Sequence, residues 1–270
     1  MTNNPTVFSQ HPPGWKFDLC SPNSPPKEVP NIDRIWPPPN TLNTTFLELP
    51  RSSLQIRGLG LAFGILLAIM TFISPAFFIY VSIIHSHIDF SSTLIGLGVT
   101  TVCCWLSAWM IRLDLEHPRD EPIRFNRARR KVYFYQYRHD LFSVFCRGRW
   151  GLKPIAYDWD DLIAEASSVY APSTSGLVEN ITIAVRKPGT DEVIDRLFFA
   201  HCWDKGEKYW ALAQLFMRQG SEALPEFYYA AQDWNDDDNL SLMHRLAPKV
   251  RWPAAMDLES RTAPTSGEHP

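Results

Sequence analysis

Two long stretches without formal charge dominate the pattern of hydrophobic and polar positions along the chain. The first covers residues 58–84 and the second covers residues 93–111. As α-helices they would measure about 40 Å and about 28 Å, against roughly 30 Å for the hydrocarbon core of a bilayer. Because backbone groups in lipid must be hydrogen-bonded within their own segment, we predict a hairpin of two transmembrane helices. Pro75 either kinks the first helix or leaves one of its ends at the membrane interface.

The basic residues around this hairpin, which we place at residues 51–117, predict its orientation. Arg51 and Arg57 precede the first stretch, and the loop between the stretches has no Lys or Arg. Seven basic residues follow the second stretch closely: Arg112, Arg119, Arg124, Arg127, Arg129, Arg130 and Lys131. Because cytoplasmic flanks carry an excess of Lys and Arg, we expect a multi-pass membrane protein with both termini in the cytoplasm.

Residues 1–50 are rich in proline and contain 11 of the 22 prolines of the chain. Proline at this density disfavours regular helices and central strands, so we expect an extended or disordered segment. Its aromatic residues either hold it on the cytoplasmic domain or at the membrane interface, or are incidental residues of a tail. They are Trp15, Phe17, Trp36 and Phe46.

Residues 118–225 change to short stretches of β-favouring residues and predict a cytoplasmic domain. We expect a hairpin of strands at 123–126 and 131–135, a third strand at 140–147, and a second hairpin at 178–187 and 193–200. A helix at about 205–219 closes the domain, with Asp204 as N-cap, Glu207 as its capping-box partner and Gly220 as the stop.

This order of elements predicts an α+β domain attached to the membrane hairpin. Its antiparallel strands would form a sheet or half-barrel capped by the C-terminal helix, as in pleckstrin-homology-like domains, an analogy that carries no function. Residues 226–256 are a C-terminal extension, and residues 257–270 are expected to be a disordered tail. The net charge of −3 does not favour nucleic acid as the main partner.

One basic cluster is a candidate contact with lipid or with a protein partner. Arg127, Arg129, Arg130 and Lys131 lie at the turn of the first predicted strand hairpin. Near anionic headgroups each charge would contribute on the order of 1 kcal/mol. The alternative is that these charges only set the topology of the hairpin, and both roles are compatible.

Other residues with ligand or acid–base chemistry have simpler interpretations. His85, His87 and Asp89 carry ligand types that bind Zn²⁺ or Cu²⁺, but without a further ligand they are interpreted as solvated loop residues. Two acidic clusters resemble Mg²⁺ or acid–base pairs: Asp158, Asp160 and Asp161 around Trp159, and Asp236, Asp237 and Asp238. The first fits a strand end and helix cap with Trp159 in the core. The second lacks the glycine and terminal glutamate of a calcium loop.

The cysteines do not form a recognisable catalytic or metal-binding pattern. The chain has no C-x-x-C pair, which disfavours a zinc site or a disulfide framework and fits a reducing cytoplasm. Cys146 and Cys202 are possible nucleophiles, but His201 beside Cys202 would point to the opposite face of a strand. We therefore predict no catalytic, cofactor-binding or metal-binding residues and do not expect an enzyme.

The layout of motifs resembles an uncharacterised proteobacterial family of two-helix inner-membrane proteins. The resemblance covers most of residues 10–225. It rests on the Pro-rich N-terminus, the hairpin, residues 123–127 and 130–133, the turn at Trp159, and Phe216-Met217 before Gly220 and Leu224-Pro225. Members of that family tend to be encoded beside type VI secretion effectors, and an immunity or accessory role has been inferred for them.

This resemblance implies a non-enzymatic immunity protein of the bacterial inner membrane that binds a cognate effector. The alternative is a membrane-anchored adaptor that recruits a secretion component or recognises anionic lipid. A membrane-bound hydrolase that uses the aspartate clusters is the third class. No active-site residue is carried over from the family, and the oligomeric state stays open.

Overall fold

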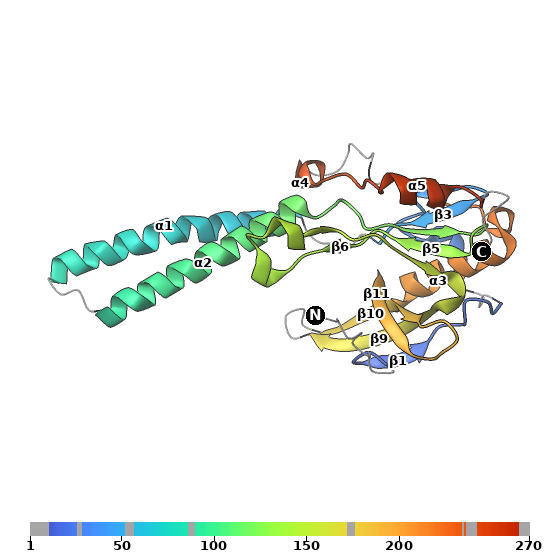
Figure 1. The fold of residues 1–270 in the computed structure, drawn as a ribbon, viewed down its shortest axis with the longest axis horizontal. Helices are drawn as coiled ribbons and strands as arrows, with labels where there is room; N and C mark the ends of the chain where they lie inside the picture. The colour runs from blue at the N-terminus through green and yellow to red at the C-terminus, as the bar shows by residue number, and fades with distance from the viewer. Residues whose placement is uncertain are drawn as a thin grey trace.

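The structure, a computed structural model, describes residues 11–25, 29–51, 57–85, 90–171, 176–233, 235 and 242–264. A pair of long helices projects from a domain in which the described residues form a five-stranded, a four-stranded and a two-stranded antiparallel β-sheet with a covering helix (Figure 1). The predicted combination of a helical hairpin with an antiparallel sheet domain is therefore confirmed.

The hairpin consists of α1 (Leu59–His85) and α2 (Phe90–Glu116). Within them, Leu59–Val81 and Thr93–Glu116 are long and apolar enough to cross a membrane, judged by length and composition. α1 runs through Pro75 as one helix. α2 continues past the uncharged stretch to Glu116, which forms an ion pair of 2.8 Å with Arg112 one turn earlier.

Two glycines let α1 approach α2 closely near the domain. A Cβ atom added to Gly64 would lie 2.6 Å from Cγ1 of Ile111, and Ser107 Oγ donates to the Gly64 carbonyl at 2.7 Å. A Cβ atom on Gly60 would lie 3.3 Å from the Met110 carbonyl. Small residues four positions apart are typical of close helix contacts in membranes, so the Gly60-x-x-x-Gly64 spacing identifies the face of α1 that meets α2.

Polar contacts fix the base of the hairpin. Asp114 on α2 accepts hydrogen bonds of 2.8 Å from the backbone N–H groups of Gly58 and Leu61 at the start of α1. The Arg57 guanidinium donates to the carbonyls of His117 (3.0 Å) and Pro118. A carboxylate at a helix N-terminus satisfies N–H groups that have no partner within the helix. The two helices are thus held to each other and to the chain that enters the domain.

The first sheet contains strands from both sides of the hairpin in the sequence. Its order is β2 (Thr41–Leu42), β3 (Phe46–Leu49), β4 (Ile123–Asn126), β5 (Lys131–Phe134) and β8 (Ile155–Asp158). The predicted 123–126 and 131–135 hairpin is confirmed by the β4–β5 pairing. The expectation that residues 1–50 hold no central strand is wrong for β3, because residues 40–49 contain no proline and can supply ladder hydrogen bonds on both edges.

The second sheet has the order β1 (Trp15–Asp18), β9 (Leu162–Ala171), β10 (Gly176–Arg186) and β11 (Val193–His201). The β10–β11 hairpin agrees with the predicted strands at 178–187 and 193–200. Of the aromatic residues noted in the Pro-rich segment, Trp15 and Phe17 lie on β1 and Phe46 on β3. The segment is therefore held on the domain by two strands.

One core lies between the two sheets and α3 (Trp203–Gln219). Trp159 is fully buried, as predicted, and its ring lies 5.0 Å from that of Trp210 on α3. Gly220 ends α3 with a positive φ of 96° and donates its N–H to the Phe216 carbonyl, which confirms the predicted stop.

The start of α3 differs from the prediction. Cys202 with φ 70° is the N-cap, and no side chain caps the helix. Asp204 lies inside the first turn and forms an ion pair of 2.7 Å with Lys208 instead. The predicted capping box is wrong because the helix begins two residues earlier than the sequence pattern indicated.

The strand predicted at 140–147 is also absent. This stretch forms the 3-10 turns η2 (Leu141–Ser143) and η3 (Arg147–Arg149), between β6 (Tyr137–Arg138) and β7 (Gly151–Leu152). The Asp140 carboxylate accepts from the Phe142 N–H at 3.0 Å and so starts a helical turn. The apolar residues here recur three positions apart, a spacing that fits such a turn and not a strand.

The chain after α3 is more ordered than expected. It contains α4 (Leu242–Leu246) and α5 (Ala254–Arg261), so the disordered tail predicted from Asp257 is wrong for residues 257–264. α5 lies along β4: Arg124 donates to Asp257 at 2.6 Å, and Asn126 donates to the Ser260 carbonyl at 3.0 Å. The polar side chains of β4 thus supply the partners that hold this segment.

Candidate functional site

The basic turn (Arg127, Arg129, Arg130 and Lys131) precedes and begins β5 at the end of the domain opposite the hairpin (Figure 1). Three of its side chains bind other parts of the chain. Arg129 donates to the Thr262 carbonyl at 3.0 Å, Arg130 to Asp160 at 2.5 Å, and Lys131 to Glu259 at 3.5 Å. These charges attach the C-terminal residues to the sheet, and they lie far from any bilayer that α1 and α2 would cross.

The first acidic cluster is part of the same arrangement. Asp158 ends β8, and Asp160 and Asp161 lie in the 3-10 turn η4 (Trp159–Asp161) with Trp159 buried beside them. The hydrogen bond from Arg130 holds the pKa of Asp160 below its usual range, and Asn23 adds a second hydrogen bond of 2.6 Å. This carboxylate is therefore engaged in a structural contact.

Several other residues singled out from the sequence cannot be joined to a site. His87, Asp89, Asp236, Asp237 and Asp238 lie outside the described residues, and His85 is the last residue of α1.

The two candidate cysteines lie in separate places. Cys146 is exposed in the loop between η2 and η3, and Cys202 is the exposed N-cap of α3. His201 shares a hydrogen bond of 3.0 Å with the Asn180 side chain, and partial burial lowers the pKa of this histidine. An imidazole engaged with Asn180 is not positioned to activate the neighbouring thiol.

A polar cavity of about 240 Å³ lies between the first sheet and the C-terminal segment. Arg124 projects into it from β4, pairs with Glu48 on β3, and bonds Asp257 on α5 at 2.6 Å. Both Arg124 and Glu48 are almost completely buried. Buried charges of opposite sign with good hydrogen bonds neutralise each other, so this network primarily ties three distant segments together.

Asp120, just past the hairpin, is the other buried acid of the cavity. Its carboxylate accepts from the N–H groups of Arg51 (3.1 Å) and Glu121 (2.8 Å) and from the Asn40 amide (3.3 Å). Burial nevertheless raises the pKa of Asp120 to about 6. These three donors hold Asp120 as a fixed acceptor at the junction between the hairpin and the domain. The residues that line this cavity are far apart in the sequence, so no sequence motif predicts that they lie together.

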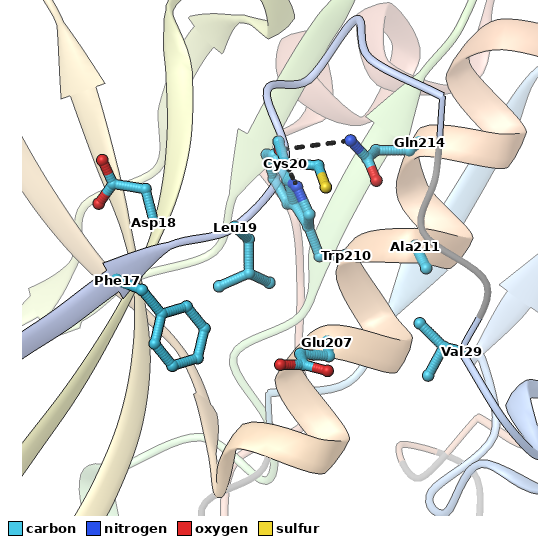
Figure 2. A pocket seen from close by; sticks show the side chains of 9 residues that line it. All are labelled: Phe17, Asp18, Leu19, Cys20, Val29, Glu207, Trp210, Ala211 and Gln214. Atoms are coloured by element: carbon cyan, nitrogen blue, oxygen red, sulfur yellow. Dashed lines mark hydrogen bonds between the residues drawn. The ribbon is translucent and has the colours of Figure 1, made fainter.

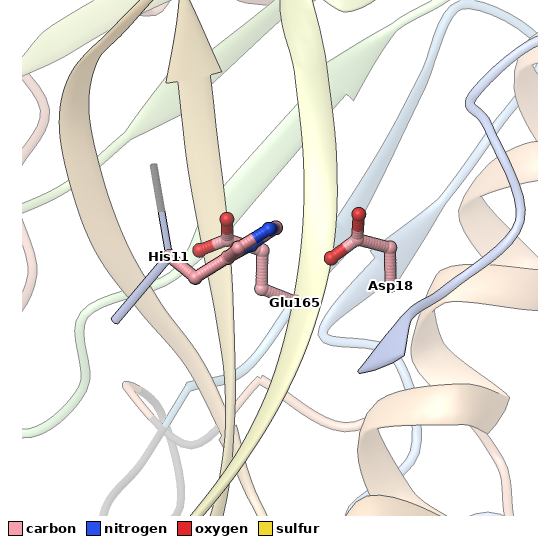
Figure 3. A group of neighbouring side chains, drawn as sticks. All are labelled: His11, Asp18 and Glu165. Carbon is pink, nitrogen blue, oxygen red and sulfur yellow. The ribbon is translucent and has the colours of Figure 1, made fainter. Parts of the chain in front are cut away.

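A third group brings one imidazole and two carboxylates together on the second sheet. Figure 3 shows His11, Asp18 on β1 and Glu165 on β9 with their side chains facing one another, and their ligand atoms all lie within 4.8 Å. Asp18 also accepts from the Trp15 indole at 2.7 Å, and Glu165 accepts from Arg196 at 2.9 Å. A divalent cation would have to compete with these donors, so the group is better explained as a polar contact between β1 and β9.

An apolar cavity of about 140 Å³ lies between the Pro-rich N-terminal segment and α3. Figure 2 shows Trp210 and Gln214 reaching from α3 to the Cys20 carbonyl, with hydrogen bonds of 2.8 Å and 3.3 Å. Gln214 also donates to the Ser21 carbonyl at 2.7 Å. This small cavity therefore lies beside the hydrogen bonds that attach the N-terminal segment to α3.

Exposed aromatic side chains gather on a surface that we call the aromatic patch (Arg34, Trp36, Tyr228 and Tyr229). Trp36 is 53% exposed and Tyr228 is 70% exposed. The rings of Trp36 and Tyr229 lie 5.1 Å apart, those of Tyr228 and Tyr229 lie 4.9 Å apart, and the Arg34 guanidinium is 5.7 Å from the Tyr228 ring centre. A hydrogen bond of 2.9 Å from the Tyr228 N–H to the Asp33 carbonyl joins the two segments.

The composition of the aromatic patch is typical of a protein-binding surface. Trp, Tyr and Arg are the residues most often found at energetic hot spots of interfaces. Aromatic rings expose a large apolar area while their polar atoms stay available for hydrogen bonds. The sequence indicated the Trp36 side of the patch, but the two tyrosines come from a segment almost two hundred residues away.

Comparison with known proteins places the chain in a family without an assigned function. The model of a family of unknown function, DUF6708, matches residues 100–264, from the middle of α2 to the residues after α5. No curated protein and no solved structure matches the chain.

Proposed function

The chain belongs to the DUF6708 family, a family of unknown function, and we propose that it is a membrane-anchored, non-enzymatic binding protein. Its hairpin would cross the bacterial inner membrane twice, and its domain would bind a protein partner from the cytoplasmic side. Two antiparallel sheets closed by one helix also support a pleckstrin-homology-like arrangement for that domain.

The exposed apolar surface of the hairpin supports membrane anchoring. Phe72 on α1 is 79% exposed and Ile83 is 73% exposed, and many other aliphatic residues of the two helices are also exposed. A contiguous apolar surface of this kind is unfavourable in water and marks a lipid or protein interface. The length of both helices matches the thickness of a bilayer core.

The charges at the base of the hairpin support the proposed orientation. Arg57, Arg112 and Arg119 lie at or beside the ends of α1 and α2 that join the domain. Excess Lys and Arg beside a transmembrane helix favours the cytoplasmic side. Because both helices join the domain at this base, the termini and the domain would share that side.

The aromatic patch is the observation that carries the binding role. It offers clustered, partly exposed rings and a guanidinium on a folded surface. We propose that the partner is a cognate antibacterial effector of a type VI secretion system and that binding neutralises it in the cell that makes it. That identity rests on the sequence resemblance alone, whereas the patch supports protein binding in general.

A survival assay tests this proposal. A candidate effector from a neighbouring open reading frame is induced in cells that express the full chain, the double variant Trp36→Ala/Tyr228→Ala, or the control Tyr170→Ala/Leu177→Ala. The control removes side chains that are 65% and 70% exposed on the second sheet. We expect the wild type and the control to restore growth and the aromatic-patch variant to lose protection.

Two outcomes would overturn parts of the proposal. If the aromatic-patch variant protects as well as the wild type, the patch is not the binding surface. If the wild type gives no protection but its deletion abolishes export of the effector, the chain acts as a membrane-anchored adaptor.

A further inference from the structure

The loop of residues 140–150 is built against the end of α2 that joins the domain. Arg112 on α2 donates to the Val144 carbonyl, and its guanidinium lies 4.6 Å from the centre of the Trp150 ring. The Trp150 indole closes the loop by donating to the Asp140 carbonyl at 3.1 Å. Figure 1 shows the chain that follows β6 lying beside the domain end of α2. The position of the loop is therefore set by contacts to the helix.

This loop exposes its most apolar side chains. Ser143, Val144 and Trp150 are buried, whereas Phe142 is 80% exposed and Phe145 is 74% exposed. Burial of a phenylalanine side chain is favourable, so the loop forgoes a substantial stabilisation while both rings face water. Two outward phenylalanines on a well-anchored loop indicate that a further apolar phase covers them.

The depth of the loop along α2 identifies that phase. The Phe142 ring lies 5.9 Å from the ring of Trp105. Trp105 precedes Arg112, the first charged residue after the uncharged stretch, by seven positions. At 1.5 Å per residue this is about 10 Å toward the lipid side of the helix end. If α2 crosses a bilayer, Trp105 lies in lipid, and the adjacent Phe142 ring lies in lipid as well.

We propose that the 140–150 loop inserts Phe142 and Phe145 into the cytoplasmic leaflet and forms a third membrane contact of the domain. The occupant is phospholipid: acyl chains around the two rings, with headgroups above them. Exposed basic residues border the loop at Arg138, Arg149 and Lys153. Cations near an anionic leaflet are attracted to its headgroups, so the positions of these three side chains fit the headgroup layer. This inference rests on the proposed membrane anchoring.

The loop contains its own labelling site, because Cys146 is exposed next to Phe145. The full chain is prepared with Cys146 as the single cysteine and with serine at the other four cysteines. An environment-sensitive fluorophore is attached there, and the protein is reconstituted into vesicles of phosphatidylcholine and phosphatidylglycerol that carry a spin label near the top of the acyl chains. Two matched single-cysteine chains lack Cys146: Phe72→Cys on α1 as the lipid reference and Leu177→Cys on β10 as the water reference.

We expect the spin-labelled lipid to quench the fluorophore at Cys146 several-fold more than at Leu177→Cys, and to an extent comparable with Phe72→Cys. Adding Phe142→Ser/Phe145→Ser to the Cys146 chain should reduce quenching to the level of the water reference. Both replaced side chains are exposed, so the fold should persist.

The failures are distinguishable. Quenching at Phe72→Cys with none at Cys146 would overturn the loop insertion and leave the anchoring in place. Quenching at neither position would overturn both. Strong quenching at Cys146 that survives the double serine change would assign the contact to other residues and contradict the role given to the two phenylalanines.

Discussion

The basic turn and the 140–150 loop face opposite ends of the domain and differ in how their charges and apolar groups are used. In the basic turn, charged side chains bind Asp160, Glu259 and the Thr262 carbonyl, and thereby hold the chain together. In the loop, Arg112 of α2 holds the backbone in place, and the side chains of Phe142 and Phe145 are left exposed. A cluster of positive charge is thus poor evidence of a membrane contact unless its side chains are free and near the helices that enter the bilayer.

The largest effect is expected from the buried charges beneath the basic turn. Arg124→Ala removes the cation that pairs with Glu48 and Asp257. Glu48 would then lose this ion pair inside the polar cavity, whereas Asp257 keeps its ion pair of 3.0 Å with Arg261. Breaking a buried pair typically costs about 3–5 kcal/mol. We expect thermal unfolding of the detergent-solubilised chain to show a loss of this size. A loss below 1 kcal/mol, as expected for an exposed pair, would contradict a structural role for the network.

Loss of the link between the loop and α2 comes next. Arg112→Ala removes a charge-assisted hydrogen bond to the Val144 carbonyl and a cation–π contact with Trp150. Together these are worth about 2–3 kcal/mol. Limited proteolysis should then cleave the 140–150 loop faster while β4 and β5 stay protected. Arg112→Lys keeps the charge and serves as the control, with an intermediate rate.

The pH dependence of the unfolding free energy tests Asp120, at the junction between the hairpin and the domain. Because burial raises the folded-state pKa of Asp120 to about 6, the folded chain binds a proton between about pH 4 and pH 6 that the unfolded chain does not. This group therefore stabilises the fold at the acidic end of that window, and the contribution is lost as the pH rises through it, by about 3 kcal/mol in all. In Asp120→Asn the unfolding free energy should lack this decline. Parallel profiles for the two chains would contradict the assignment to Asp120.

The smallest effect is expected at the surface of the basic turn. Arg130→Ala breaks a pair in which both side chains are about half exposed. Such pairs contribute about 0.2–1 kcal/mol. We expect a small change in the melting temperature and unchanged flotation with vesicles of anionic lipid. If flotation is reduced for Arg130→Ala and unchanged for Phe142→Ser/Phe145→Ser, the basic turn and not the 140–150 loop is the membrane contact.

The sequence predicts the parts of this molecule that depend on local pattern. Uncharged stretches of sufficient length define α1 and α2, and the alternation around Ile181, Ile183 and Val185 defines β10. Residues 140–147 were predicted as a strand because their apolar residues are also β-favouring. Only the Asp140 cap and the contact with Arg112 decide in favour of the helical turns. The position of α5 also depends on long-range contacts, because Arg124 on β4 holds it in place.

Local patterns do not predict surfaces formed by residues that are far apart in the sequence. The aromatic patch joins Trp36 to Tyr228 and Tyr229, and the polar cavity joins Asn40 and Asp120 to Asp257. No spacing rule relates positions so far apart. The basic turn was visible as a run of charge, but the partners that neutralise it lie in α5 and η4, and their position is a property of the fold.

Protease accessibility in spheroplasts tests the central claim most directly, that the hairpin spans the inner membrane with the domain inside the cell. A protease is added outside intact spheroplasts and then after lysis, and the domain is followed with an antibody to residues 176–264. The account predicts that this fragment survives in intact spheroplasts and is digested only after lysis, while the chain resists extraction by alkaline carbonate. Digestion of the fragment in intact spheroplasts, or release of the chain by carbonate, would contradict it.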